Sequence, residues 1–382
     1  MIELMIDALL GVVYIVVAGI IVTVGWRLQW ALRHFTNKNI MTPATVIEDK
    51  PSVSIVIPAR NEDHAMTDCL QSALQTTYPK VEFIVMDDAS ADKTSSLIKA
   101  FAHDGVRFIE GHQLPAEWLG KNYALHRLVG EASGTYVLFM DVDTRLSPES
   151  VERMVAYAEQ EQANMVSIMP RREDGLRLGT IFSPLRYFWE IIFHTPAKPA
   201  VASSAWLVRK SIFMDSFDGF KGMKDVVQPE SKVAALFASQ QTYRFLISTP
   251  SVGITYTKKW SSQVETSIRL LYPLLGARVA HSLIALLDLL IVLSPVLILA
   301  TGFVVGWNVH HIVAGVLWLG FVVIYGTYTR RVWKKGWLLG AILWNFSVIQ
   351  ELILIVKSTI QYKRNKITWK GRHIPLPSEL RR

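Results

Sequence analysis

The amino-acid sequence predicts an α/β domain with a mostly parallel sheet, flanked by transmembrane α-helices. Two features indicate this architecture: short apolar runs alternate with polar helical stretches over 51–257, and long apolar segments lie before and after that region. The composition agrees, because 51% of the 382 residues are hydrophobic, only 19% are charged and the mean hydropathy is +0.26. A water-soluble protein of this length usually carries more charge, so we expect part of the chain to lie in a membrane.

The first predicted element is an N-terminal transmembrane anchor, residues 1–38. Its apolar run, 6–24, carries only Asp7 at its start and is long enough to cross about 30 Å of hydrocarbon. Positive charges follow this run, whereas a cleavable signal peptide has them first. By the positive-inside rule, we expect the residues after the anchor to be cytoplasmic.

Residues 51–257 have the length of one α/β domain. The predicted strands, at 52–57, in the stretch KVEFIVMDDAS where the strand closes on two aspartates, and near 106–110, are separated by helical stretches, one through Leu74 and one over 92–102. This β-α-β-α-β order indicates a parallel sheet with helices on both faces. In such sheets, ligands bind at the carboxyl ends of the strands.

An acidic pair follows the predicted strand 136–140. In an extended chain, Asp141 and Asp143 would point to the same side of the sheet. Two carboxylates in that position suit Mg²⁺ or Mn²⁺, which one or two carboxylates and phosphate oxygens usually hold. An Asp-x-Asp triplet alone more often marks a turn or a helix cap.

Three motifs in order give the triplet a context: SIVIPARNE, VMDDASADKT and YVLFMDVD. Together they resemble the nucleotide-sugar-binding half of inverting glycosyltransferases of family 2, which have the GT-A (Rossmann-like) fold. The resemblance covers roughly 51–256. Two shorter elements, LPAEWLGKNYAL and TWKGRHI, are similar to motifs of the membrane-bound branch that contains carotenoid- and hopanoid-associated glycosyltransferases.

The resemblance implies roles for individual residues. Asp88 would accept the N3–H of a uracil, although it could instead cap the following helix, as Asp92 also could. Lys121 would reach the diphosphate or the nucleoside, its alternative being an ordinary surface lysine. The remaining implied donor and metal residues are Pro58, Arg60 and Glu62 along the base and ribose, Asp141 at the ribose or sugar, and Asp143, with Asp141, on the metal.

An inverting transfer also needs a general base that deprotonates the acceptor. The family usually places it in a Glu-Asp pair that opens a helix, and here the matching positions are Pro229 and Glu230. Glu230 is therefore the candidate base, with Asp225 as the reserve. Proline followed by glutamate is also an ordinary helix start, which the helix dipole favours.

Four segments follow the predicted catalytic domain. We expect an amphipathic interfacial helix at 258–278 and two transmembrane helices within 279–328. The segment 337–357 is either a re-entrant or interfacial helix or a third transmembrane helix, because crossing would put Asn345, Gln350 and Glu351 near the middle of the bilayer. The last segment, 358–382, is predicted to be a basic cytoplasmic tail.

The net charge of +8 is concentrated beside the apolar segments, in clusters such as 330–335 and 363–372. Anionic lipid headgroups or topology signalling explain this distribution better than nucleic acid does. The sequence therefore predicts a multi-pass protein of the cell membrane with a cytoplasmic catalytic domain. The single cysteine, Cys69, excludes a disulfide framework and fits a reducing compartment.

The predicted function is glycosyltransferase activity that moves one sugar from a nucleotide sugar, a UDP-sugar, to a membrane lipid such as a carotenoid, hopanoid or diacylglycerol. A polymer channel is not expected, because no Q-x-x-R-W motif is present. Transfer to polyprenyl phosphate and non-catalytic sugar-nucleotide binding are the alternatives. Aromatic residues could line an acceptor cleft or belong to the core: Phe188, Trp189, Phe193, His194, Trp206 and Trp260.

Overall fold

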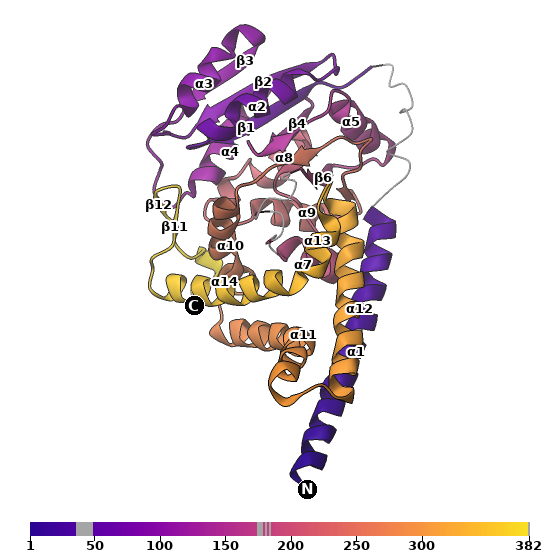
Figure 1. Ribbon diagram of the computed structural model, residues 1–382. Helices are drawn as coiled ribbons and strands as arrows, with labels where there is room; N and C mark the ends of the chain where they lie inside the picture. Colours follow the sequence, from indigo (N-terminus) through magenta and orange to yellow (C-terminus); the bar gives the residue numbers. More distant parts are fainter. Residues whose placement is uncertain (36–48, 174–178, 180–181, 183–184, 381–382) are drawn as a thin grey trace. The chain divides into compact units, whose positions relative to one another are not determined.

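The computed structural model describes residues 1–35, 49–173, 179, 182 and 185–380 (Figure 1). The chain forms two compact units. The sheet unit comprises His34–Glu173, His194–Thr257 and Lys370–Arg382, and the helical unit comprises Met1–Arg33, Asp174–Phe193 and Lys258–Trp369. The last residues of the chain, part of the predicted basic tail, thus belong to the sheet unit.

The sheet unit is built on a seven-stranded sheet with the strand order β3-β2-β1-β4-β8-β6-β9. β1 lies parallel to β2 and β4, and β2 lies parallel to β3, whereas β8 is antiparallel to its neighbours β4 and β6. A mostly parallel sheet with flanking helices was the sequence prediction and is confirmed. The strands are β1 (Val53–Ala59), β2 (Val81–Asp87), β3 (Val106–Glu110), β4 (Tyr136–Met140), β6 (Met165–Met169), β8 (Ala205–Arg209) and β9 (Tyr243–Ile247).

Both faces of this sheet are buried, which explains the nearly continuous apolar strands. Successive side chains of β1 alternate between two hydrophobic clusters, with Ile55 and Ile57 on one face and Val56 on the other. The first cluster is covered by α2 (Asp63–Leu74), α3 (Thr94–Ala100) and α5 (Ser150–Gln160), and the second by α4 (Gly120–Glu131), α8 (Lys210–Phe217) and α9 (Pro229–Ser239).

Small elements complete the sheet unit. A three-stranded sheet contains β5 (Thr144–Arg145), β10 (Thr255–Tyr256) and β7 (Arg171–Arg172). Helix α3 is shorter than the predicted 92–102, because Asp92 lies before the helix and accepts hydrogen bonds there. The other short elements are the 3₁₀ turns at Ala102–Asp104, Lys221–Met223 and Ser378–Leu380, and the strand β12 (Arg372–His373).

Trp206 belongs to the core and does not line an acceptor cleft. It is 2% exposed and lies on β8 directly opposite Phe139 of β4, with ring centroids 3.9 Å apart in a stacked arrangement. Phe213 and Phe220 also pack around this pair. The antiparallel pairing of β8 with β4 turns the indole into the sheet face that α4, α8 and α9 cover, so of the two roles considered from sequence, cleft or core, Trp206 has the core role.

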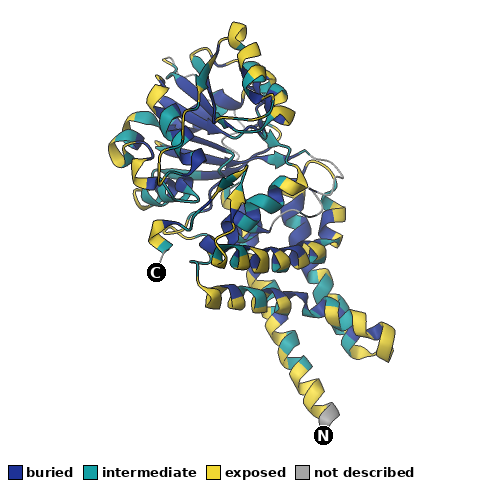
Figure 2. Cartoon of the chain, turned by 90° about the vertical axis from the view of Figure 1, so that its left-hand side faces the viewer, coloured by how far each residue is buried: buried dark blue, intermediate teal, exposed yellow. Residues whose placement is uncertain are grey.

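Among its described residues, the helical unit contains three helices long and apolar enough to span a membrane. They are Leu4–Phe35 within α1 (Ile2–Phe35), α11 (Val279–Val305) and α12 (Val309–Val332), which match the predicted spans. Much of α1 is exposed (yellow in Figure 2), including Leu9, Ile15 and Val22. Such surface is unfavourable in water and suits a lipid environment.

The segment predicted to be re-entrant, interfacial or membrane-spanning forms two helices, α13 (Trp337–Ile342) and α14 (Trp344–Lys363). Neither is among the three span candidates of the described chain. The polar residue Gln350 of α14 has partners inside the helical unit, since its side chain accepts from Trp260 Nε1 at 2.7 Å and donates to the Phe182 carbonyl at 2.9 Å. These bonds offset the cost of burying the amide.

The predicted amphipathic helix at 258–278 corresponds to α10 (Trp260–Leu274), which packs along α14 in the helical unit. Ser358 of α14 donates to the Ile268 carbonyl at 2.6 Å and accepts from the Tyr272 amide at 2.9 Å. The helix therefore buries part of its surface against protein. The other elements of this unit are α7 (Arg186–Phe193) and β11 (Thr368–Trp369).

We predict that Trp206→Ala lowers the free energy of unfolding by about 3–5 kcal/mol, because it leaves a cavity against Phe139 and removes the stacked ring. Trp206→Phe keeps an aromatic ring and should cost clearly less. Thermal unfolding of the detergent-purified chain measures both. Equal melting temperatures for the alanine variant and the wild type would contradict this account of the core.

Candidate functional site

The site lies at the carboxyl ends of β1, β2 and β4, where two loops are joined by hydrogen bonds. Asn61 follows β1, and its amide donates to Ser90 Oγ at 2.9 Å while its Oδ1 accepts from the Ala91 amide at 2.9 Å. The Glu62 amide donates to Thr94 Oγ1 at 2.8 Å. Asn61 has a φ of 50°, a conformation that asparagine tolerates better than most residues. These contacts fix the positions of Glu62 and the aspartates at the end of β2.

The two aspartates at the end of β2, Asp87 in the strand and Asp88 directly after it, have different environments. Asp87 accepts hydrogen bonds from Ser90 and so closes its own loop. Asp88 is 4% exposed and forms an ion pair with Arg372, whose NH1 lies 2.5 Å from its Oδ2. Burial raises the pKa of Asp88, and the charge of Arg372 opposes this shift.

The second oxygen of Asp88, Oδ1, is buried and has no hydrogen-bond partner among the described residues. The alternative role of Asp88, capping the next helix, is filled by Asp92, whose Oδ1 accepts from the Thr94 amide at 2.9 Å. A buried carboxylate with an unused acceptor is an unfavourable feature unless a partner arrives. Asp88 therefore has the chemistry of a ligand contact.

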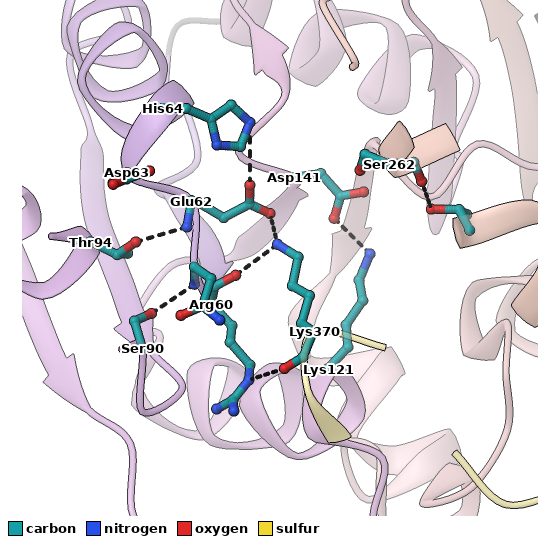
Figure 3. Close-up of polar contacts among 12 residues, drawn as sticks. Arg60, Glu62, Asp63, His64, Ser90, Thr94, Lys121, Asp141, Ser262 and Lys370 are labelled. Atoms are coloured by element: carbon teal, nitrogen blue, oxygen red, sulfur yellow. Dashed lines mark hydrogen bonds and ion pairs between the residues drawn. The ribbon is translucent and has the colours of Figure 1, made fainter. Parts of the chain in front are cut away.

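The side chain of Arg60 forms its hydrogen bonds with backbone carbonyl groups. Its guanidinium donates to the carbonyls of Asp88 and Ala89 and, through Nε, to the Lys370 carbonyl at 3.1 Å. It therefore connects the loop after β2 with the C-terminal residues (Figure 3). Pro58, also predicted to line the nucleotide, is a half-buried residue of β1 opposite Met86 of β2.

Lys121 is not an isolated surface lysine. It lies in the first turn of α4, and its Nζ is 2.6 Å from Asp141 Oδ1 (Figure 3). Both side chains are about one fifth to one quarter exposed, so a ligand can still reach them. The sequence prediction placed these two residues at one site, and the structure brings them together.

Asp141 and Asp143 are not in an extended chain. The Thr144 amide donates to the Asp141 carbonyl at 3.0 Å and closes a turn after β4, so the expectation based on strand geometry is wrong. Asp143 instead lies with Glu62 and His64, and one ligand atom from each of the three is within 4.8 Å of the others. Asp141 is not part of that group and contacts Lys121.

Two carboxylates and an imidazole can hold a divalent cation, and their chemistry suits Mn²⁺ or Mg²⁺. Glu62 also forms an ion pair with Lys370 and lies 3.9 Å from His64 Nε2. Burial raises the pKa of Glu62, and the positive charge of Lys370 opposes the shift. The donor set thus fits the predicted metal, with Glu62 and His64 in addition to Asp143. The sequence reasoning did not assign His64 or Glu62 to the metal.

The candidate base Glu230 opens α9 and is 4% exposed, directly after Pro229 in the first turn. The reserve candidate Asp225 is half-buried and accepts a hydrogen bond from the Ser378 amide at 2.5 Å. Asn122 of α4 holds the backbone next to Asp225, since its Nδ2 donates to the carbonyls of Met223 and Val226 at 2.7 and 2.8 Å. Asn122 of the LGKN element therefore positions the backbone around Asp225. The sequence did not indicate this role.

Sequence reasoning assigned no site role to two C-terminal residues, Lys370 and Arg372. It noted their motif, TWKGRHI, as a mark of the membrane-bound branch and assigned the cluster 363–372 to anionic headgroups or topology. In the structure, these two side chains bind the carboxylates of Glu62 and Asp88. The short motif was the available signal, but its distance in sequence from the aspartates concealed the contact.

A parallel-stranded α/β sheet with acidic and basic side chains gathered at the carboxyl ends of its strands is the arrangement of nucleotide-binding α/β enzymes. Residues 54–217 match the model of the family described as Glycosyl transferase family 2. This region of the chain is therefore a glycosyl transferase family 2 domain, as the motifs predicted.

The curated relatives include two 4,4'-diaponeurosporenoate glycosyltransferases. One, from Staphylococcus aureus (strain bovine RF122 / ET3-1), is 29% identical over 138 residues, which are 36% of each chain. The other, from Staphylococcus haemolyticus (strain JCSC1435), is 33% identical over 125 residues, which are 32% of this chain and 33% of the relative. The chain thus matches about a third of the length of these relatives.

Among solved structures, the mannosyltransferase PcManGT from Pyrobaculum calidifontis, in complex with GDP-Man and Mn²⁺, has a similar fold. The TM-score is 0.55 at 19% sequence identity, and the likeness covers 88% of this chain and 99% of that chain. This agreement confirms the predicted GT-A fold.

We predict that Gly120→Ala disturbs the site, because a Cβ at residue 120 would lie 2.8 Å from Asp88 Oδ2 and 2.5 Å from Arg372 NH1. Overpacking of this kind costs about 1–3 kcal/mol. Gly130→Ala in the same helix is the matched control, since its Cβ meets nothing within 4 Å. The control should stabilise the helix by about 0.5–1 kcal/mol. Thermal unfolding of the two variants should shift in opposite directions, and a stabilising Gly120→Ala would contradict the close approach.

Proposed function

We propose that this chain is a membrane-bound inverting glycosyltransferase that moves a single sugar from a UDP-sugar to a lipid acceptor such as a carotenoid, hopanoid or diacylglycerol. The observation that carries the proposal is the buried, incompletely satisfied carboxylate of Asp88 at the sheet edge of a glycosyl transferase family 2 domain. The same edge carries the Lys121–Asp141 pair and the Glu62–His64–Asp143 group. The similarity to the diaponeurosporenoate glycosyltransferases supports a carotenoid-like acceptor.

Asp88 Oδ1 is suited to accept the N3–H of a uracil, because a buried acceptor gains most from a new hydrogen bond. Lys121 can contact the diphosphate once Asp141 turns to the ribose or the sugar. A divalent cation held by Asp143, with Glu62 and His64 beside it, would neutralise charge on the departing nucleoside diphosphate. PcManGT carries GDP-Man and Mn²⁺, so both UDP and GDP donors belong in the test.

Glu230 is proposed as the general base that deprotonates the acceptor hydroxyl or carboxyl. Its near-complete burial at a helix start suits a carboxylate that acts on a proton away from bulk water. The three apolar helices are proposed to hold the chain in the cell membrane, with the catalytic domain on the cytoplasmic side. A lipid acceptor would then meet the enzyme at the membrane surface.

The direct test supplies lipid extracts with radiolabelled UDP-glucose and, separately, GDP-mannose, in the presence of Mn²⁺. We expect a neutral glycolipid in which an α-linked donor gives a β-linked product, to be checked by NMR of the anomeric proton. A phosphosugar labile to mild acid would instead indicate a polyprenyl-phosphate acceptor. Metal-dependent nucleotide binding without any product would leave a binding protein and overturn the proposed activity.

Glu230→Gln should lower kcat by at least about 100-fold, because the base contributes roughly 10²–10⁴-fold to such reactions. Binding of UDP should remain within about threefold of the wild type, since the amide keeps the shape of the side chain. Asp225→Asn is the comparison variant. If Asp225→Asn abolishes turnover and Glu230→Gln does not, the base is Asp225.

Asp143→Asn should remove the dependence of nucleotide binding on Mn²⁺, because an amide is a much poorer ligand for a hard cation than a carboxylate is. His64→Ala should weaken that dependence to a smaller degree. Asp63→Asn is the control, since Asp63 is an exposed neighbour outside the three-residue group. Titration of UDP binding with Mn²⁺ measures all three variants, and an unchanged Asp143→Asn would exclude this metal site.

A further inference from the structure

The turn that joins β11 and β12 brings two basic side chains to the candidate site. Lys370 and Gly371, the two residues of the turn, have φ values of 47° and 78°. Consecutive positive φ values are the mark of a type I′ turn, in which glycine is favourable and lysine is uncommon. Lys370 thus adopts a backbone conformation that its side chain does not favour, which tertiary contacts must stabilise.

Lys370 has these contacts in the loop after β1. Its Nζ forms an ion pair with Glu62 and donates to the Arg60 carbonyl at 2.7 Å, while Arg60 Nε donates back to the Lys370 carbonyl at 3.1 Å. Figure 3 shows the lysine pointing toward Glu62, next to the Lys121–Asp141 pair. The ammonium group therefore lies against a carboxylate of the candidate metal group.

Arg372 contacts Asp88, the carboxylate that is predicted to bind the nucleobase. Its NH1 is 2.5 Å from Asp88 Oδ2, and the missing side chain of Gly120 leaves the space that it occupies. Asp88 is 4% exposed with this arginine in place. The guanidinium thus contacts Oδ2, the carboxylate oxygen next to the one that is proposed to accept from a nucleobase.

The residues beyond Arg372 contact the segment that contains the candidate bases. Ile374 is 4% exposed, the Ser378 amide donates to Asp225 Oδ2, and Glu379 forms an ion pair with Lys232 of α9. The tail 370–380 thus contacts both the carboxylates of the candidate donor site and the region of the proposed base.

We propose that Lys370 and Arg372 are donor-binding residues whose side chains leave Glu62 and Asp88 and bind the diphosphate of the nucleotide sugar; this inference rests on the proposed function. A diphosphate would add negative charge beside the carboxylates that these two side chains now contact, and cations at the same place remove the repulsion. An arginine fork and a lysine ammonium are the side chains that phosphate oxygens bind best.

The experiment measures binding of UDP, GDP, uridine and guanosine, each with Mn²⁺, to the detergent-purified full chain by calorimetry. Lys370→Gln and Arg372→Gln should each weaken binding of the preferred diphosphate at least about tenfold and change binding of its nucleoside less than threefold. Arg372→Lys, which keeps the charge, should recover part of the loss. Lys366→Gln is the matched control, an exposed residue four positions before Lys370, and should bind as the wild type does.

The outcomes separate the inference from the proposed function. A wild type that binds neither diphosphate would contradict the proposed function. If the wild type binds a diphosphate and the glutamine variants bind it equally well, or bind it more tightly, the two cations are not phosphate ligands and the inference is wrong. Equal weakening of nucleotide and nucleoside would also overturn it, since that result indicates a structural role only.

A measurement on the wild-type chain covers the case in which a variant does not fold. Hydrogen exchange of the peptide containing 370–380 is followed with and without the diphosphate. We expect the diphosphate to change exchange in this peptide and the nucleoside alone to leave it unaltered. Identical exchange in the presence of a saturating diphosphate would contradict a change of partner by Lys370 and Arg372.

Discussion

The candidate site depends on ion pairs between acidic side chains at the carboxyl ends of the strands and basic side chains from other parts of the chain. The pairs are Glu62 with Lys370, Asp88 with Arg372 and Asp141 with Lys121. A parallel sheet brings the ends of its strands to one edge, so residues after β1, β2 and β4 become neighbours. Partly buried carboxylates at such spacing are unfavourable unless cations compensate them.

The backbone conformation at the site allows these cations to reach the carboxylates. Gly120 leaves room for Arg372 beside Asp88, and the positive φ of Lys370 aims its side chain at Glu62. Asn61, also at positive φ, closes the loop after β1 against the loop after β2. Each of these conformations costs free energy on its own, and the ion pairs and hydrogen bonds offset that cost. The site is thus held in place by contacts between residues far apart in sequence.

The sheet could be predicted from sequence because each strand is marked by residues that are close together in the chain. Short apolar runs followed by polar residues identify β1, β2 and β4, and the alternation with helices identifies their parallel order. The sequence leaves the conformation at Asp141–Thr144 open, because an Asp-x-Asp triplet is compatible with both a strand end and a turn. It also leaves Trp206 open between a cleft and the core, because composition does not distinguish a core indole from a ligand-contacting one.

The basic partners could not be predicted, since no periodicity connects Arg372 with Asp88, 284 positions away. The structure nevertheless gives a physical reason why two short motifs occur in one chain. The glycine of WLGKN and the arginine of TWKGRHI meet at Asp88, where a Cβ on residue 120 would lie 2.5 Å from the guanidinium. A side chain at 120 would force the guanidinium to shift, and without the arginine Asp88 would lose its ion pair. The two motifs therefore pack together around the carboxylate of Asp88, and a substitution in one motif should change the conformation of the other.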